Sequence, residues 1–221
     1  MASEDENVDL IIKIVIIGDT AVGKTNLILR YLRDQYDSDN KATIGVDFFV
    51  KDMETDGHKF KIQFFDTAGQ EKYKSICSTY YKNADGVILA YDVVNRRSFD
   101  NIESWLDEIH RYQTKDTKVL LVGNKIDLDA KRQVTTDEGQ TFAKEKKLYF
   151  METSALTNKD KCVNKSFEVI INEIMSIMLQ KRDEAEKLEY EQIKRKSLVF
   201  NIKNSQVDTT EGNNTGKSCA C

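Results

Sequence analysis

Proline is absent from the 221-residue chain, although average usage of about 5% would give roughly 11. Turns and helix ends must therefore be made by other residues, chiefly Gly, Asn, Asp and Ser, which favour these positions. We interpret the absence as a compositional bias without functional meaning.

Cysteine, long apolar segments and excess positive charge are also scarce. Four cysteines make no disulfide framework, and the acidic start of the chain has no apolar signal region, so we expect a reducing compartment. The longest apolar runs, such as Ile14–Ile17 and Val87–Tyr91, have about five residues or fewer, whereas a membrane-spanning helix needs about 20. Ala2 stands where N-myristoylation requires glycine, so we expect no N-myristoyl anchor. The net charge of −4 argues against a nucleic-acid partner, because sequence-independent binding needs a basic face.

Short apolar runs alternate with amphipathic segments along the chain. We expect strands over residues 11–17, 48–53, 59–65, 87–91, 119–122 and 148–151, and helices over 24–35, 99–111 and 136–147. A last helix is marked by one apolar stripe from Phe167 to Met178. Asp56-Gly57 predicts a hairpin turn. The pattern predicts an α/β fold with a doubly wound, mostly parallel sheet and one antiparallel edge strand.

Three parts are expected along the chain: a flexible N-terminal arm over 1–9, a folded domain over 10–180, and a helix extension with a disordered tail over 181–221. Residues 181–196 carry six basic and five acidic residues, which is typical of a solvated helix and not of a basic membrane patch. From about Asn201 the chain is polar and aperiodic, so we expect disorder there.

A phosphate-binding loop is predicted between the first strand and the first helix. The residues Gly18, Asp19, Thr20, Ala21, Val22, Gly23, Lys24 and Thr25 fit the pattern G-x-x-x-x-G-K-[ST]. Glycines let backbone N–H groups turn toward anionic oxygens, and the helix directs its positive end to the same place. Lys24 can neutralise phosphate charge and Thr25 can ligate Mg²⁺. The alternative is a glycine-containing turn with an exposed lysine.

A second polar segment, Asp66-Thr67-Ala68-Gly69-Gln70-Glu71, directly follows the strand that ends at Phe65. An acidic residue at the carboxyl end of a parallel strand faces the ligand crevice, which places Asp66 to hold Mg²⁺ through water. Gly69 offers a backbone N–H to a γ-phosphate, and Gln70 can orient an attacking water. The alternative is an ordinary surface turn, which would explain the glycine but not why the segment is positioned to face the phosphate loop.

Two further segments predict selection of guanine. Asp127, in Asn124-Lys125-Ile126-Asp127, can accept hydrogen bonds from N1–H and the 2-amino group, and adenine offers neither donor there. The Lys125 stem can lie over the base, and Asn124 can tie this loop to the phosphate loop. After the last strand come Ser154 and Ala155, and the Ala155 N–H can reach the guanine O6. This pattern opposes a P-loop ATPase or kinase.

In these motifs and their order, the chain resembles a small GTPase of the Ras superfamily over about residues 10–180, and within it the Rab branch. The segment from Lys41 to Phe48 resembles the first Rab switch, and Tyr80–Ala84 and Leu89–Val93 resemble other Rab segments. The resemblance implies the P-loop small GTPase fold with GTP or GDP and Mg²⁺ bound. It also implies that Thr43 ligates Mg²⁺ through its hydroxyl and contacts the γ-phosphate through its backbone N–H. The catalytic residues expected from the resemblance and the motifs together are Gln70, Gly69, Lys24 and Thr43.

The resemblance further implies a switch that binds GTP, hydrolyses it slowly and regulates vesicular membrane traffic. The implied partners are effectors at the switch surface, an exchange factor, a GTPase-activating protein, a GDP-dissociation inhibitor and a prenyltransferase escort. Cys219-Ala220-Cys221 is similar to the Rab Cys-x-Cys ending, which implies geranylgeranylation of Cys219 and Cys221 and a lipid anchor on the cytoplasmic face of intracellular membranes, cycling with the cytosol. The alternative is a GTP-locked binding module without significant hydrolysis.

Several residues depart from the Rab pattern. Phe65 stands where Rabs usually have Trp, and Lys72-Tyr73-Lys74 replaces Arg-Phe-Arg. We expect effectors to contact Ile44, Phe48, Phe65 and Tyr80. Other residues receive no chemical role: His58 and His110 are isolated, and Cys77, Cys162 and Trp105 are interpreted as packing residues.

Overall fold

The computed structural model describes residues 8–39, 43–69, 80–112, 114 and 116–207, with side chains as far as Lys194. The chain forms two compact units, Met1–Ser176 and Ile177–Cys221. No helix in these described ranges is both long and apolar enough to span a bilayer.

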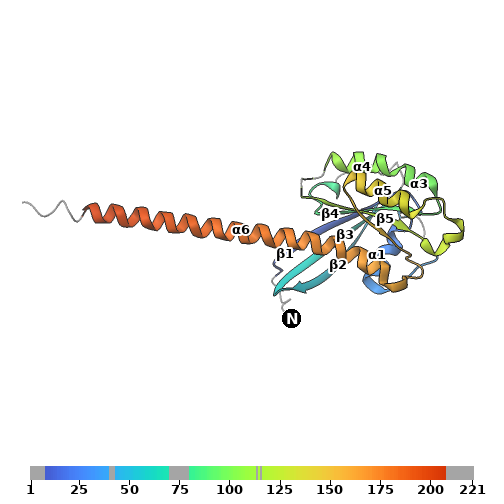
Figure 1. Ribbon diagram of the computed structural model, residues 1–221. Helices are drawn as coiled ribbons and strands as arrows, with labels where there is room; N and C mark the ends of the chain where they lie inside the picture. The colour runs from blue at the N-terminus through green and yellow to red at the C-terminus, as the bar shows by residue number, and fades with distance from the viewer. Residues whose placement is uncertain (1–7, 40–42, 70–79, 113, 115, 208–221) are drawn as a thin grey trace, which may run out of the picture. The chain divides into compact units, whose positions relative to one another are not determined.

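A six-stranded sheet forms the centre of the first unit (Figure 1). Its strands, in the order β2-β3-β1-β4-β5-β6 across the sheet, are β2 (Val46–Thr55), β3 (His58–Thr67), β1 (Leu10–Ile17), β4 (Gly86–Asp92), β5 (Lys118–Asn124) and β6 (Tyr149–Glu152). All neighbouring pairs are parallel except β2 and β3, which form an antiparallel hairpin with Thr55 opposite His58. The predicted fold class is confirmed, including the turn at Asp56-Gly57.

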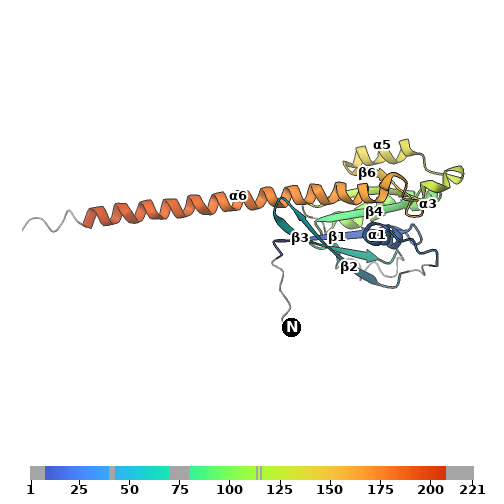
Figure 2. The same cartoon turned by 90° about the horizontal axis from the view of Figure 1, so that it is seen from below.

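Helices cover both faces of the sheet. Figure 1 shows α3 (Arg96–Asp100), α4 (Ile102–His110) and α5 (Thr136–Lys146) on one face. Seen from below in Figure 2, α1 (Lys24–Arg33) and the first part of α6 (Cys162–Val207) lie in front of the strands. Two short 3₁₀ helices, η2 (Ile126–Lys131) and η3 (Lys159–Lys161), complete the described elements. This layering buries the β4 strand completely.

Apolar side chains from distant segments fill both layers between sheet and helices. On the α4 side, Leu89 packs with Trp105 and Leu106 in one buried cluster. On the α1 side, the Phe167 ring stacks on Tyr31 at 4.5 Å between centroids, and the Phe64 ring lies 5.7 Å from Phe167. Since these aromatic contacts join α1, β3 and α6, they fix α1 against the sheet and position the loop that precedes it.

Two helices differ from the expectation. The predicted helix over 99–111 is divided into α3 and α4 at Asn101, which caps the end of one and the start of the other. The last helix runs through Val207, past Asn201, where the sequence predicts the start of a disordered tail. A polar segment has no apolar face to pack against a core, but its backbone can still form helical hydrogen bonds. An existing helix can therefore extend into it one residue at a time.

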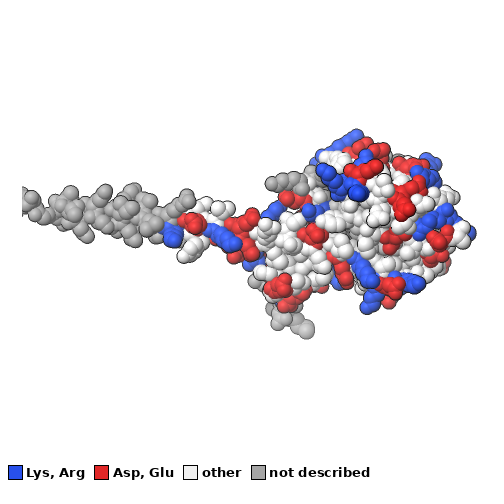
Figure 3. Space-filling model, viewed as in Figure 1, with Lys and Arg blue, Asp and Glu red and all other residues white. Residues whose placement is uncertain are grey.

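The surface of the first unit carries charges of both signs. In Figure 3, Lys and Arg side chains alternate with Asp and Glu over the visible face. Several are paired across elements, including Arg96 with Glu138 and Arg132 with Glu152. Charges of both signs are thus interspersed over the visible face (Figure 3).

Candidate functional site

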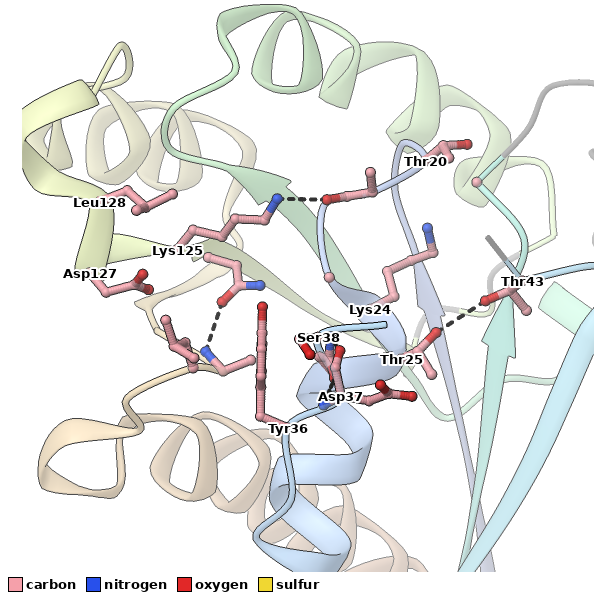
Figure 4. A pocket seen from close by; sticks show the side chains of 17 residues that line it. Thr20, Lys24, Thr25, Tyr36, Asp37, Ser38, Thr43, Lys125, Asp127 and Leu128 are labelled. Atoms are coloured by element: carbon pink, nitrogen blue, oxygen red, sulfur yellow. Dashed lines mark hydrogen bonds between the residues drawn. The ribbon is translucent and has the colours of Figure 1, made fainter. Parts of the chain in front are cut away.

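A cavity of about 450 Å³ lies at the carboxyl ends of β1 and β5 and at the start of α1. Figure 4 shows Lys24, Thr25 and Thr43 at one end and Lys125 and Asp127 at the other. Seventeen residues line it: Thr20, Ala21, Gly23, Lys24, Thr25, Asn26, Tyr36, Asp37, Ser38, Thr43, Gly69, Asn124, Lys125, Asp127, Leu128, Ala155 and Leu156. Within the described ranges, five predicted site residues are outside this lining and form hydrogen bonds with residues in it: Gly18, Asp19, Val22, Asp66 and Ser154.

The phosphate-binding loop connects β1 directly to α1. Gly23 has φ +97°, and a Cβ there would lie 2.5 Å from Asn124 Nδ2, so both conformation and space require glycine. Lys24 is only 6% exposed, and its Nζ donates hydrogen bonds at 2.9 Å to the carbonyl oxygens of Gly18 and Asp19. The loop thus holds a cation beside the positive end of a helix, which is an arrangement suited to an anion.

Asp19 is itself anchored by α4. Its carboxylate accepts hydrogen bonds from Asn101 Nδ2 at 2.7 Å and from Trp105 Nε1 at 2.8 Å. The interpretation of Trp105 as a packing residue is therefore incomplete, because its buried indole also fixes the phosphate loop. No pattern local to α4 reveals this contact, which spans 86 positions in the sequence.

Oxygen atoms converge beneath the phosphate loop. Thr25 Oγ1 donates to Asp66 Oδ2 and lies 3.1 Å from Thr43 Oγ1. Asp66 is fully buried, and its Oδ1 has no hydrogen-bond partner within the described part of the chain. Burial is the largest influence on the Asp66 carboxyl and raises its pKa to about 6. An orphaned carboxylate oxygen with two hydroxyls is a donor set that fits Mg²⁺, which prefers oxygen ligands and would favour the ionised carboxylate.

Asn124 holds the opposite end of the cavity together. Its Nδ2 donates to Val22 O at 2.9 Å, while its Oδ1 accepts from Thr153 Oγ1 and from Ala155 N, both at 3.2 Å. The expected tie between this segment and the phosphate loop is present. Ala155 lines the cavity, and its buried N–H donates to Asn124 Oδ1.

Lys125 and Asp127 occupy the region predicted to select the base. Lys125 has φ +72°, and its Nζ reaches back to Ala21 O at 2.7 Å and Asp92 Oδ2 at 2.8 Å, so its stem spans the cavity (Figure 4). Ser154 Oγ donates to Asp127 Oδ1 and leaves the other carboxylate oxygen for other donors. Asp92 was not predicted, although its place at the end of β4 is the signal that singled out Asp66.

Tyr36 lines the cavity and was also missed by the sequence reasoning. It follows α1, is 41% exposed and stands within the cavity between the Lys125 and Thr25 ends (Figure 4). Its loop is tied to α1, since Asn26 Nδ2 donates to Asp37 O at 3.0 Å and Asn26 Oδ1 accepts from Asp37 N at 2.9 Å. An exposed aromatic beside a polar cavity could have signalled a stacking surface for a planar ligand.

A row of apolar side chains lies on the exposed side of the β2–β3 hairpin. The rings of Phe48 and Phe65 are 5.1 Å apart, and those of Phe65 and Tyr80 are 5.4 Å apart. Phe48 is 53% exposed and Ile44 is 82% exposed. The four residues expected to contact effectors are therefore described, and three of them form one continuous aromatic row.

Other predicted residues lie outside the described ranges. These are Gln70, the substituted segment Lys72–Lys74, Cys77, and the tail cysteines Cys219 and Cys221.

The fold and cavity define a P-loop nucleotide-binding protein: a parallel sheet, a glycine-lysine-threonine loop before a helix, and a polar pocket across the strand ends. Residues 13–176 match the model of the Ras family. The chain is 45% identical to the Ras-related protein RABA6b of Arabidopsis thaliana over 179 residues, 81% of this chain and 77% of that relative. It is 39% identical to RABA5c of the same plant over 222 residues, all of both chains. The chain belongs to the Ras family and is a Rab-type small GTPase.

Proposed function

We propose that the protein is a guanine-nucleotide switch that binds GTP, hydrolyses it slowly to GDP and phosphate, and acts through effectors in vesicular membrane traffic. The observation that carries the proposal is a cavity that has the phosphate loop at one end and the Asn124–Asp127 segment at the other. Its volume of about 450 Å³ is within the usual range of small-molecule sites, about 300–1,000 Å³.

The phosphate end supplies charge neutralisation. Lys24, held at the loop carbonyls, lies where it can exchange those bonds for phosphate oxygens. Thr25, Thr43 and Asp66 would hold Mg²⁺, which screens the phosphate charge. Gly69 lies against the Asp19–Thr20 peptide, and we assign its N–H to the γ-phosphate. Loss of the γ-phosphate on hydrolysis would release the segments that contain Thr43 and Gly69. This release is the proposed conformational switch between the GTP and GDP states.

The base end supplies specificity. A planar base fits between the Lys125 stem and the Tyr36 ring, with the Asp127 carboxylate at its edge. Guanine can donate N1–H and its 2-amino group to this carboxylate, while adenine offers neither donor and would turn its N1 lone pair toward the charge. We therefore propose Asp127 and Ala155 as the groups that recognise guanine.

Hydrolysis requires a water molecule that is oriented for attack on the γ-phosphate. We assign the orienting role to Gln70 because it directly follows Gly69 in the sequence. No arginine lines the cavity among the residues that the structure describes. In the related Ras case intrinsic turnover is about 10⁻⁴ s⁻¹ and a trans-acting arginine accelerates it about 10⁵-fold. Because the described cavity lining supplies no arginine, we propose that the protein by itself hydrolyses GTP slowly and that an activating protein accelerates the reaction with its own arginine.

Effector binding and membrane attachment complete the proposal. Phe48 lies on β2, which follows the Thr43 segment, and its partner Phe65 lies on β3, which precedes Gly69. A nucleotide-dependent change in those segments can therefore alter the aromatic row that effectors contact. Attachment through lipidated Cys219 and Cys221 stays a prediction, to be tested by intact mass spectrometry of the protein from its native cell.

The base-selection experiment tests the proposal directly. Asp127→Asn should exchange guanine for xanthine preference in competition between GTP and XTP, because an amide can donate to the 2-oxo group. Asp129→Asn, on the same 3₁₀ helix but outside the cavity lining, is the matched control and should keep guanine preference. A D127N protein that still prefers GTP would remove Asp127 as the base-recognising group.

A further inference from the structure

Arg30 lies on α1 and joins this helix to the loop that follows β6. Its Nε donates to Ala155 O at 2.8 Å and its Nη2 donates to Leu156 O at 3.0 Å. Its side chain is only 13% exposed. The guanidinium therefore holds two successive backbone carbonyls of a segment 125 and 126 positions further along the chain.

The two bonds use one rigid edge of the guanidinium. Nε–H and Nη2–H point the same way from a planar group, so carbonyls bonded to both are fixed in direction as well as distance. The remaining nitrogen, Nη1, bonds to Asp34, which lies one turn further along the chain. A lysine ammonium is a point charge on a flexible stem and cannot reproduce this planar grip.

Ala155 itself lines the cavity, and its N–H is the backbone group that we propose for recognition of the base. Its N–H is bonded to Asn124 Oδ1 at 3.2 Å, and Ala155 is 4% exposed. Holding the carbonyls of Ala155 and Leu156 restrains rotation of the backbone on the carboxyl side of this N–H. On its amino side, Ser154 is held through its hydroxyl to Asp127 and through its N–H to Cys162 Sγ at 3.4 Å. The N–H is thus fixed from both sides.

We propose that Arg30 is a positioning residue for recognition of the 6-oxo group of guanine, acting by orienting the Ala155 N–H. The inference rests on the proposed function, since it takes the base end of the cavity as a guanine site. Because α1 also carries Lys24 and Thr25, Arg30 ties the base-reading loop to the helix that holds the phosphates. Its role differs from that of Asp127, which faces the N1 and 2-amino edge.

Nucleotide analogues separate the two edges of the base. In 6-thio-GDP the O6 is replaced by sulfur, a weak acceptor, while N1–H and the 2-amino group remain. In IDP the 2-amino group is missing and O6 remains. Competition against GDP therefore gives one affinity ratio for the 6-position and another for the 2-position, both on the full-length protein with Mg²⁺.

Arg30→Met and Arg30→Lys are compared with the wild type and with Asp34→Asn, which removes the Asp34 charge that pairs with Arg30 and keeps the Nη1 bond to Asp34 O. Wild type should prefer GDP to 6-thio-GDP by about fivefold, the value of one hydrogen bond of about 1 kcal/mol. R30M should lose most of this preference, R30K should be intermediate, and D34N should match wild type. The preference for GDP over IDP should be unchanged in all four proteins.

The outcomes are distinguishable. If R30M or, where R30M does not fold, R30K lowers both ratios equally or changes neither, Arg30 is a structural residue only and the proposal is overturned. If wild type itself shows no preference for GDP over IDP, the assignment of Asp127 fails and the proposed function fails with it. Selective loss of the 6-position ratio supports the proposal.

Discussion

Removal of the Asn124 side chain tests how the two ends of the cavity are joined. Asn124 is 1% exposed, and its side chain makes three hydrogen bonds to described residues, with Val22 O, Thr153 Oγ1 and Ala155 N. Asn124→Ala removes all three at once and leaves the buried Thr153 hydroxyl and Ala155 N–H without this partner. We expect the phosphate loop and the loop after β6 to lose their shared support.

The magnitude follows from the count of bonds. A net contribution of about 1 kcal/mol for each bond gives about 3 kcal/mol in the free energy of unfolding. Thr153→Val removes only the 3.2 Å bond between the Thr153 hydroxyl and Asn124, so it should cost about 1 kcal/mol. In the double variant the Thr153 bond is already lost, so its cost should be about 1 kcal/mol less than the sum of the two single variants.

The assay is urea unfolding of the Mg²⁺–GDP protein at two GDP concentrations, so that the ligand's mass-action contribution can be subtracted. A second readout is the rate of GDP dissociation, which should rise in N124A. If N124A costs no more than T153V, or if the double variant is strictly additive, Asn124 does not join the two loops in the way its contacts indicate.

Two more predictions concern the phosphate loop and the surface. A Cβ on Gly69 would lie 2.4 Å from the backbone atoms Asp19 C and Thr20 N, so Gly69→Ala should displace its N–H from a γ-phosphate and lower GTP affinity relative to GDP by about 10- to 100-fold. Equal losses for both nucleotides in equilibrium binding would refute this role. Glu138 accepts from the Thr135 backbone N–H at 2.9 Å and pairs with Arg96, and the Thr135 bond is the main cause that lowers its pKa from 4.5 to about 2. A depressed carboxyl pKa stabilises the fold above pH 4.5 and loses that effect toward pH 2. Glu138→Gln should therefore be destabilised at pH 7, and its Tm should approach that of the wild type as the pH falls below 4.5; a Tm difference that is constant from pH 7 to 3 would contradict this.

Local chemistry made most of the fold predictable. The β-branched apolar runs indicated the strands, and Asp56-Gly57 indicated the hairpin because few residue pairs suit its turn. The phosphate loop was predictable because its spacing itself encodes the chemistry. The division at Asn101 was missed, since Asn101 Nδ2 bonds to Asp19, and periodicity within one segment does not report such a partner.

The support of the site was less predictable than its central residues. Lys24 and Asp127 belong to compact motifs, whereas Arg30 contacts Ala155 from 125 positions away and Trp105 contacts Asp19 from 86. Both looked like ordinary helix residues, one charged and one aromatic. Their roles depend on how α1 and α4 pack against the sheet, and only the three-dimensional structure specifies that.

Single-turnover hydrolysis of GTP tests the central claim most directly. Protein loaded with GTP is mixed with Mg²⁺, and phosphate release is followed beside Gln70→Leu, which keeps nucleotide binding but removes the water-orienting amide. We predict slow, Mg²⁺-dependent phosphate release by the wild type, of the order of 10⁻⁴ s⁻¹ as in the related Ras case, and a lower rate for Q70L at nearly unchanged GTP affinity. Equal rates in both proteins, or no release above the spontaneous rate, would contradict the switch and leave a GTP-locked binding module.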